Sequence, residues 1–135
     1  MWDETIVRVR YAETDKMGIV HHANYYVWFE LGRSEYCRAR GFSYLEMEEK
    51  DGLLMVVAES QCRYISPAFY EDLLTVRTKI EDIRSRSLTF TYEVFRESDN
   101  VLLAKGLTKH LMTDQDKSIR RLPEKYRVIL SSGRE

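Results

Sequence analysis

Residues 11–30 read YAETDKMGIVHHANYYVWFE, and the predicted architecture can be built outward from them. The segment leaves an alternating stretch, passes through a polar loop that contains Gly18, and enters a helix at Asn24. Asn24 is a typical helix N-cap residue, because its side-chain oxygen can accept a free backbone N–H of the first turn. The sequence therefore predicts that the loop carboxylate of Asp15 lies near the N-terminus of a helix.

A helix of about 15 residues is predicted from Asn24 to a stop near Gly41. Its apolar positions recur at helical spacing, in Tyr25, Trp28, Phe29, Tyr36 and Ala39. Its charged positions are expected on the solvent-exposed face, at Glu30, Arg33, Glu35, Arg38 and Arg40. Gly32 lies inside this helix, where glycine costs about 1 kcal/mol relative to alanine. We therefore expect Gly32 to permit close approach to a neighbouring backbone.

The flanking segments are predicted mostly as strands. Residues 5–11 alternate, with Val7, Val9 and Tyr11 on one side. After the long helix, Ser43 and Glu46 form a capping-box pattern that opens a shorter helix. Further strands are predicted over residues 53–65, 72–83, 87–95 and 101–113, and a short helix after Pro123. Because the connections between the last four strands are too short for crossover helices, these strands should be antiparallel. The pattern predicts a two-layer α+β fold with an antiparallel sheet packed on a helix.

Length and charge restrict the class of protein further. The 135 residues fit one domain, 1–135. The 21 Lys and Arg residues nearly balance 22 Asp and Glu residues, which argues against a nucleic-acid partner. No apolar run reaches the roughly 18 residues of a membrane span, and the acidic N-terminus does not resemble a signal peptide. Cys37 and Cys62 match no disulfide or metal spacing, so we expect free thiols and a cytoplasmic location.

The loop and the helix start together suggest a chemistry. Backbone N–H groups at a helix N-terminus can polarise a carbonyl oxygen and stabilise negative charge on it. A carboxylate near the carbonyl carbon, here that of Asp15, would complete a minimal acyl-transfer site.

The same residues resemble the signature of the hotdog-fold acyl-CoA thioesterases, specifically the YbgC and 4-hydroxybenzoyl-CoA thioesterase group. The similarity extends over roughly residues 5–115. The matching positions are Tyr11, Asp15, Gly18-Ile19-Val20, Asn24-Tyr25, Trp28-Phe29-Glu30 and the later Tyr64-Ile65-Ser66-Pro67-Ala68 with Asp72.

The resemblance implies a hotdog fold, in which an antiparallel sheet wraps a long central helix. It implies a homodimer or homotetramer with active sites at the subunit interface, an acyl-CoA substrate and no cofactor. It places Asp15 at the catalytic carboxylate and His22 at the helix-start position whose backbone N–H polarises the thioester carbonyl. Tyr11, Gly18 and Asn24 are the expected substrate-binding positions, with Gly18 allowing a tight loop and Tyr11 packing at the strand end.

Several alternatives stay open at the level of sequence. Asp15 could attack the carbonyl carbon as a nucleophile, or it could activate a water as a general base. The acyl group could be carried by acyl carrier protein instead of CoA, or the fold could bind acyl-CoA without turnover. Glu59 could be a second acid, although its outward alternation favours a solvated or interface position.

Two further groups of residues are interpreted without a role in binding. Arg84 and Arg86 could meet CoA phosphates, although an exposed turn is the simpler interpretation. A metal site at His21, His22 and His110 is not expected, because adjacent histidines should project apart and no third ligand has metal-like spacing.

Overall fold

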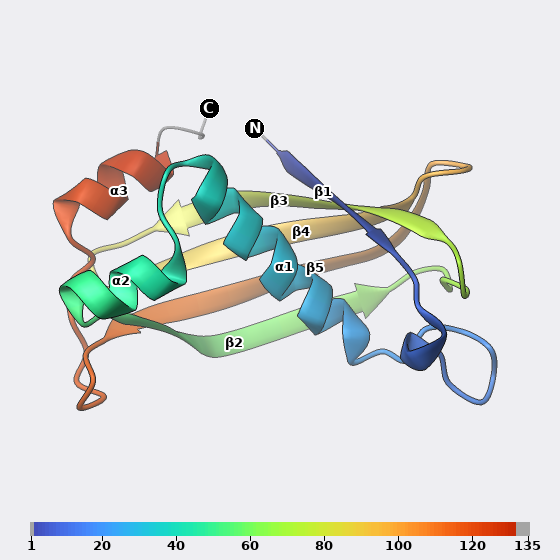
Figure 1. Cartoon of the computed structure of the whole chain (residues 1–135), viewed down its shortest axis with the longest axis horizontal. Helices are drawn as coiled ribbons and strands as arrows, with labels where there is room; N and C mark the ends of the chain where they lie inside the picture. Colours follow the sequence, from blue (N-terminus) through green and yellow to red (C-terminus); the bar gives the residue numbers. More distant parts are fainter. Residues whose placement is uncertain (1, 132–135) are drawn as a thin grey trace.

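A five-stranded antiparallel sheet lies behind one long helix in the computed structural model, which describes residues 2–131 (Figure 1). The predicted α+β architecture, with an antiparallel sheet packed on a long helix, is confirmed. The elements in chain order are β1 (Asp3–Arg8), a 3-10 helix (Tyr11–Glu13), α1 (Asn24–Ala39), α2 (Tyr44–Asp51), β2 (Leu54–Tyr64), β3 (Leu73–Ile83), β4 (Ser87–Arg96), β5 (Val101–Thr113) and α3 (Glu124–Ser131).

The strand order in the sheet is β1-β3-β4-β5-β2, and every neighbouring pair is antiparallel. Consecutive strands β2 and β3 are therefore not neighbours: residues 65–72 carry the chain from one side of the sheet to the other. Strands β1 and β2 form the two edges. The pairing of β2 with β5 is interrupted by a bulge between Val57 and Glu59.

The core lies between α1 and the concave face of the sheet. The alternation predicted for two central strands is confirmed, because all of its inward positions are buried: Leu74, Val76, Thr78 and Ile80 on β3, and Leu88, Phe90, Tyr92 and Val94 on β4. Phe29 of α1 stacks on Tyr92, with ring centroids 4.3 Å apart. Stacked aromatic rings of this kind add to the stabilisation that area burial alone provides.

Gly32 brings α1 close to the sheet, but the atoms it makes room for belong to side chains of β3 and not to the neighbouring backbone that was expected. A Cβ atom at this position would overlap Thr78 Oγ1 and would lie 3.3 Å from Val76 Cγ1. Gly106 on β5 has a similar role, since a Cβ there would overlap the ring of Phe29. The two glycines therefore set how closely the central helix can sit on the sheet.

Several expectations for β1 and α1 are wrong. Strand β1 ends at Arg8, and the chain turns into the 3-10 helix because the carboxylate of Glu13 accepts a hydrogen bond from the N–H of Arg10 at 2.7 Å. Tyr11 is consequently 76% exposed and does not pack at the strand end. On α1, Arg33 was expected on the solvent-exposed face but is only 9% exposed. Ala39 was expected among the apolar positions but is exposed.

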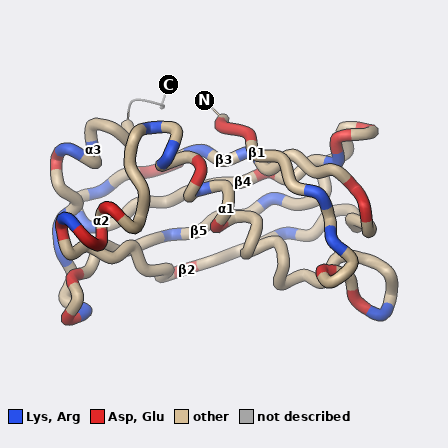
Figure 2. Tube along the Cα trace, in the orientation of Figure 1, with Lys and Arg blue, Asp and Glu red and all other residues tan. Residues whose placement is uncertain are grey.

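Helices α2 and α3 lie at one end of the sheet, and the 3-10 helix and the loop of residues 14–23 lie at the other (Figure 1). The capping prediction for α2 is confirmed: the hydroxyl of Ser43 accepts from the N–H of Glu46 at 3.2 Å, and Gly52 ends the helix at φ +63°. Basic and acidic residues both occur at each end of the molecule (Figure 2).

Candidate active site

Asp15 lies in a tight loop that connects the 3-10 helix to the start of α1. Thr14 and Val20 form an isolated antiparallel bridge that closes this loop. The N–H of Asp15 donates to the carbonyl of Ile19 at 2.8 Å. Gly18 has φ +83°, a conformation that favours glycine, so its predicted role in the tight loop is confirmed. The carboxylate of Asp15 accepts a hydrogen bond from the N–H of Met17 at 2.8 Å, and this fixes the side chain at the loop.

Asn24 attaches the loop to the helix in a different way from the predicted N-cap. The N-cap position is Ala23, and Asn24 is the first residue of α1. The amide nitrogen of Asn24 donates to the carbonyl of Glu13 at 2.9 Å and to that of His21 at 3.3 Å. The side chain therefore acts as a donor that joins two turns of the loop, adding to the backbone hydrogen bonds that the same two carbonyls already accept.

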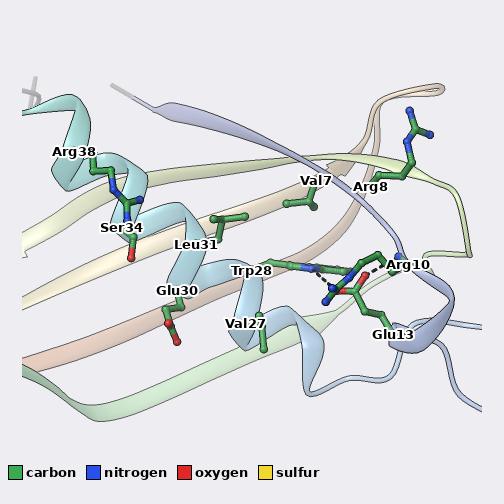
Figure 3. A pocket seen from close by; sticks show the side chains of 10 residues that line it. All are labelled: Val7, Arg8, Arg10, Glu13, Val27, Trp28, Glu30, Leu31, Ser34 and Arg38. Carbon is green, nitrogen blue, oxygen red and sulfur yellow. Dashed lines mark hydrogen bonds and ion pairs between the residues drawn. The ribbon is translucent and has the colours of Figure 1, made fainter. Parts of the chain in front are cut away.

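Glu13 links the segment before the Asp15 loop to α1. Its side chain is buried, and its carboxylate accepts from the indole N–H of Trp28 at 3.3 Å and from the guanidinium of Arg10 at 3.3 Å (Figure 3). A buried carboxylate needs such partners to offset its desolvation. The sequence analysis did not identify Glu13 as a structural residue. The signal available was an acid two positions before Asp15 together with Trp28 one turn into the predicted helix.

A second segment closes the other side of the loop. The N–H of Val20 donates to the carbonyl of Ala68 at 2.9 Å, and Ile19 forms an isolated bridge with Phe69. Arg96 of β4 holds this segment by donating to the carbonyl of Pro67 at 3.0 Å. The Asp72 carboxylate accepts from the N–H of Phe69 at 2.9 Å. Residues 65–72 are therefore braced against the Asp15 loop.

These two segments enclose a cavity of about 430 Å³ at the N-terminus of α1. Asp15 and His22 both line it, so the structure brings the two predicted catalytic positions together. The rest of the lining is mostly apolar: Met17, Ile19, Val20, Tyr25, Tyr64, Ile65, Ser66 and Pro67. Burial raises the pKa of Tyr25 to about 12, so its phenol stays protonated and can only donate or accept as a neutral group.

The three predicted substrate-binding residues are not in that lining. Gly18 and Asn24 shape the loop behind it, and Tyr11 instead packs against Tyr70, with ring centroids 5.6 Å apart. Tyr64, by contrast, was noted only as part of a resemblance. It lines the cavity and its hydroxyl donates to the carbonyl of His22 at 3.2 Å.

The backbone of His22 offers a free donor at this cavity. Within residues 2–131, the N–H of His22 has no hydrogen-bond acceptor, whereas the N–H groups of His21 and Ala23 donate to Glu13 and to the His21 ring. The imidazole of His22 is exposed and stacks on that of His21, with centroids 4.3 Å apart, so the expectation that the two rings project apart is wrong. An unpaired N–H just before a helix is the kind of donor that polarises a carbonyl oxygen.

The other candidate residues lie elsewhere. His110 is fully buried in the core, and residues 2–131 contain no group of three His, Cys, Asp or Glu side chains placed to hold a metal ion. Glu59 is exposed on β2, outside the cavity. Arg84 lies in an exposed turn, where it pairs with Asp82 at 2.7 Å.

A hollow of about 500 Å³ lies between β1 and the outer face of α1 (Figure 3). It contains Arg8, Arg10 and Arg38, and its buried acid, Glu13, is already occupied by Arg10 and Trp28. Asp15 and His22 do not border it. We therefore assign the candidate active site to the smaller cavity, where a carboxylate and a free N–H meet.

Comparison with known proteins identifies the family. A sequence model of the thioesterase superfamily matches residues 17–103. The chain is 32% identical to the acyl-CoA thioesterase YbgC of Haemophilus influenzae over 111 residues, covering 82% of this chain and 80% of that protein. It is 35% identical to the acyl-CoA thioester hydrolase YbgC of Escherichia coli over 97 residues, covering 72% and 71%.

The fold agrees with this assignment. The crystal structure of a DHNA-CoA thioesterase from Staphylococcus aureus superimposes with a TM-score of 0.91 at 32% identity, covering 97% of this chain and 89% of the other. The chain therefore belongs to the thioesterase superfamily, and the predicted resemblance to the YbgC group is confirmed. The protein is an enzyme of this hotdog class, a thioester hydrolase. In residues 2–131, no helix is both long and apolar enough to cross a bilayer.

Proposed function

We propose that the protein hydrolyses acyl-CoA thioesters at the cavity between Asp15 and His22. The observation that carries the proposal is that Asp15 and His22, whose backbone N–H has no acceptor within residues 2–131, line a single, largely apolar cavity. The YbgC relatives named above are acyl-CoA thioesterases, which supports CoA as the carrier of the acyl group.

In the proposed reaction, the thioester carbonyl oxygen accepts a hydrogen bond from the N–H of His22. This donor stabilises the negative charge that develops on the oxygen when the carbonyl carbon is attacked. Because the thiolate of CoA is a good leaving group, its departure needs no strong acid. Since the backbone supplies the donor, the imidazole of His22 has no necessary part in bond breaking.

Two roles for Asp15 fit the geometry. As a nucleophile, its carboxylate forms a bond to the acyl carbon while the C–S bond breaks, and water then opens the mixed anhydride to the free acid. As a general base, it takes a proton from the water that attacks, and the thiolate leaves and is protonated. Only the first route forms a covalent acyl-enzyme at Asp15, which mass spectrometry of enzyme quenched during a single turnover detects.

The test of the proposal is steady-state hydrolysis of short, medium, long and aromatic acyl-CoAs, with free thiol as the readout. Asp15→Asn keeps an oxygen for the N–H of Met17 but removes the charge, so kcat should fall by about 100-fold or more. Asp114→Asn is a control outside the cavity: Asp114 accepts from the N–H of Asp116 in the same way, and because it also pairs with Arg120, thermal unfolding checks that the variant is folded. An Asp15→Asn enzyme with nearly full activity would refute the assignment, and preferential turnover of acyl carrier protein thioesters would reassign the carrier.

We further propose that the active enzyme is a homodimer, or a pair of dimers, with the cavity close to the subunit interface. Strand β2 supports this, because it is a long edge strand whose residues from Val57 to Gln61 are all exposed. Unpaired edges of this kind are normally covered or paired. Sedimentation of the purified protein tests the proposal. A cytoplasmic location and the extent of the domain over 1–135 stay predictions.

A further inference from the structure

A single side-chain hydrogen bond joins the end of strand β2 to the backbone just before α1. The hydroxyl of Tyr64, the last residue of β2, donates to the carbonyl oxygen of His22 at 3.2 Å. The phenol ring meets the imidazole of His22 edge-on at 6.2 Å and the ring of Tyr25 at 5.2 Å between centroids. Tyr64 therefore contacts His22 through both its ring and its hydroxyl, although the two residues are 42 positions apart in the sequence.

The two peptide groups that flank the Cα of His22 have four polar groups, and three of them have partners. The carbonyl of His21 accepts from the backbone N–H of Asn24 at 3.0 Å and from its side-chain amide at 3.3 Å. The N–H of Ala23 donates to the imidazole of His21 at 3.2 Å. The carbonyl of His22 accepts from Tyr64. In the described part of the chain, the fourth group, the N–H of His22, has no acceptor.

Tyr64 is the one partner that comes from outside the helix start. Asn24 and the imidazole of His21 belong to the same turn, and so does the N–H of Tyr25, which donates to the His22 carbonyl at 3.3 Å. Because each peptide group is planar, the direction of the His22 N–H relative to the next peptide depends on only two soft dihedral angles. A bond from β2 fixes that next peptide relative to the sheet.

The phenol of Tyr64 is suited to this task. It is 45% exposed and lines the cavity together with Asp15 and His22. Partial burial and the nearby thiol of Cys62 raise its pKa, so the hydroxyl keeps its proton near neutral pH. A phenol has one proton to donate, and here it is donated to the carbonyl of His22. The hydroxyl is therefore occupied and is not a second donor to the substrate.

We propose that Tyr64 is a positioning residue, whose hydroxyl holds the His22 peptide so that the free N–H of His22 points at the thioester carbonyl oxygen. The inference rests on the proposed function, in which that N–H stabilises the charge that develops on the oxygen. Preorganised donors lower the barrier because they need no reorientation during the reaction. Without the bond from Tyr64 the backbone before α1 gains freedom, and a small misplacement of a catalytic group costs up to about 100-fold in rate.

The first test is Tyr64→Phe, which removes the hydroxyl and keeps the ring that packs on His22 and Tyr25. We expect kcat for acyl-CoA hydrolysis to fall by about tenfold or more and KM to stay within about twofold, because the interaction lost acts in the transition state. Tyr126→Phe is the matched control: it also removes one phenol hydrogen bond, to Asp51, but at the other end of the sheet (Figure 1). Its kcat and KM should equal those of the wild type.

The second test shows whether the effect passes through the N–H of His22. In an oxoalkyl-CoA ketone, a methylene group separates the sulfur from the carbonyl, so the analogue has no thioester bond to hydrolyse and keeps the oxygen that accepts from the N–H. Hydrogen bonding lowers the stretching frequency of a carbonyl, and difference infrared spectra of the isotope-labelled analogue measure this shift. The bound carbonyl should absorb at a lower frequency in the wild type and in Tyr126→Phe than in Tyr64→Phe.

Three results would overturn the positioning role. Wild-type kcat and KM in Tyr64→Phe would show that the bond is unnecessary, and a higher KM at unchanged kcat would make Tyr64 a binding residue instead. A lower kcat with an unchanged carbonyl frequency would show that its effect does not pass through the N–H. All three leave the proposed function intact as long as the wild type hydrolyses acyl-CoA and Asp15→Asn does not, whereas a wild type without hydrolysis refutes the proposed function itself.

Discussion

The indole N–H of Trp28 donates to the buried carboxylate of Glu13 at 3.3 Å, which joins the first turns of α1 to the segment just before Asp15 (Figure 3). The same carboxylate accepts from the backbone N–H of Arg10 at 2.7 Å. A single acid therefore fixes the end of β1, the 3-10 helix and the central helix relative to one another. The position of Asp15 at the cavity depends on this arrangement.

Replacing Glu13 should consequently affect both stability and catalysis. Glu13→Ala leaves the backbone N–H of Arg10 and the indole N–H of Trp28 without their partner, removes an ion pair of Arg10 and opens space at Trp28, so we expect the free energy of unfolding to fall by about 2–4 kcal/mol. Glu13→Gln keeps a side-chain oxygen and should lose less. Denaturant unfolding and kcat/KM of both variants provide the measurement. If Glu13→Ala had wild-type stability and wild-type kcat/KM, the anchoring role would be wrong.

Asn24 offers a test that separates two structural roles. If its side chain capped the helix, Asn24→Asp would be harmless, because aspartate is an equally good N-cap. The structure shows donation from the amide to the carbonyls of Glu13 and His21, which a carboxylate cannot provide. We therefore expect Asn24→Asp to destabilise the protein by about 1–3 kcal/mol in urea unfolding, more than Asn24→Ala does. Equal stability of Asn24→Asp and the wild type would favour the capping role.

His22 distinguishes backbone from side-chain chemistry. His22→Ala removes the imidazole but keeps the N–H, so kcat should remain close to that of the wild type. His22→Pro removes the N–H itself, and loss of such a donor typically costs about 100- to 1000-fold in kcat. Circular dichroism and thermal unfolding of both variants serve as the check on folding. A strong loss of kcat in a folded His22→Ala enzyme would instead assign a catalytic part to the imidazole.

His110 should make stability depend on pH in mildly acidic solution. Its pKa is about 3 in the folded protein, because of burial and the charge of Arg33, against about 6.5 in an unfolded chain. Below pH 6.5 the unfolded chain binds a proton that the folded protein does not, so this contribution is complete above pH 6.5 and is lost as the pH falls toward 3. The slope approaches about 1.4 kcal/mol per pH unit.

The measurement is urea unfolding between pH 7 and 4.5. His110→Gln should flatten the dependence over this range, although it lowers stability at pH 7 by removing one of the two side-chain partners of the Thr108 hydroxyl. The carboxyls of Asp51 and Asp114 have pKa values that hydrogen bonds hold below the usual range, so the stability they add is lost only in more acidic solution. A His110→Gln protein with the wild-type slope would contradict the assignment.

Local patterns were sufficient to predict much of the fold. The alternation in β3 and β4, the capping of α2 by Ser43 and the close approach at Gly32 all depend on neighbours in sequence or on the period of one element. The positions of Asp15 and Gly18 in the loop followed for the same reason, since a strand end and a helix start lie only a few residues on either side.

The errors concern contacts between distant segments. Arg33 has the periodicity of a surface residue, but the sheet curves far enough around α1 to bury it. Asn24 has the identity of a cap, yet its partners are set by how the preceding loop folds back. The burial of Glu13 could not be predicted from local sequence, because it depends on the contact of its carboxylate with Trp28 on α1. Tertiary geometry of this kind has no counterpart in local spacing.

The unpaired edge of strand β2 also affects how readily the chain aggregates while it folds. Extended segments of other chains can add to such an edge and begin fibrillar growth, so recovery from denaturant should fall as the protein concentration rises. Glu59 and Arg63 are charged and exposed on this edge strand, and we expect their charges to oppose such pairing. Strand β2 thus combines an unpaired edge with charged side chains that should disfavour aggregation.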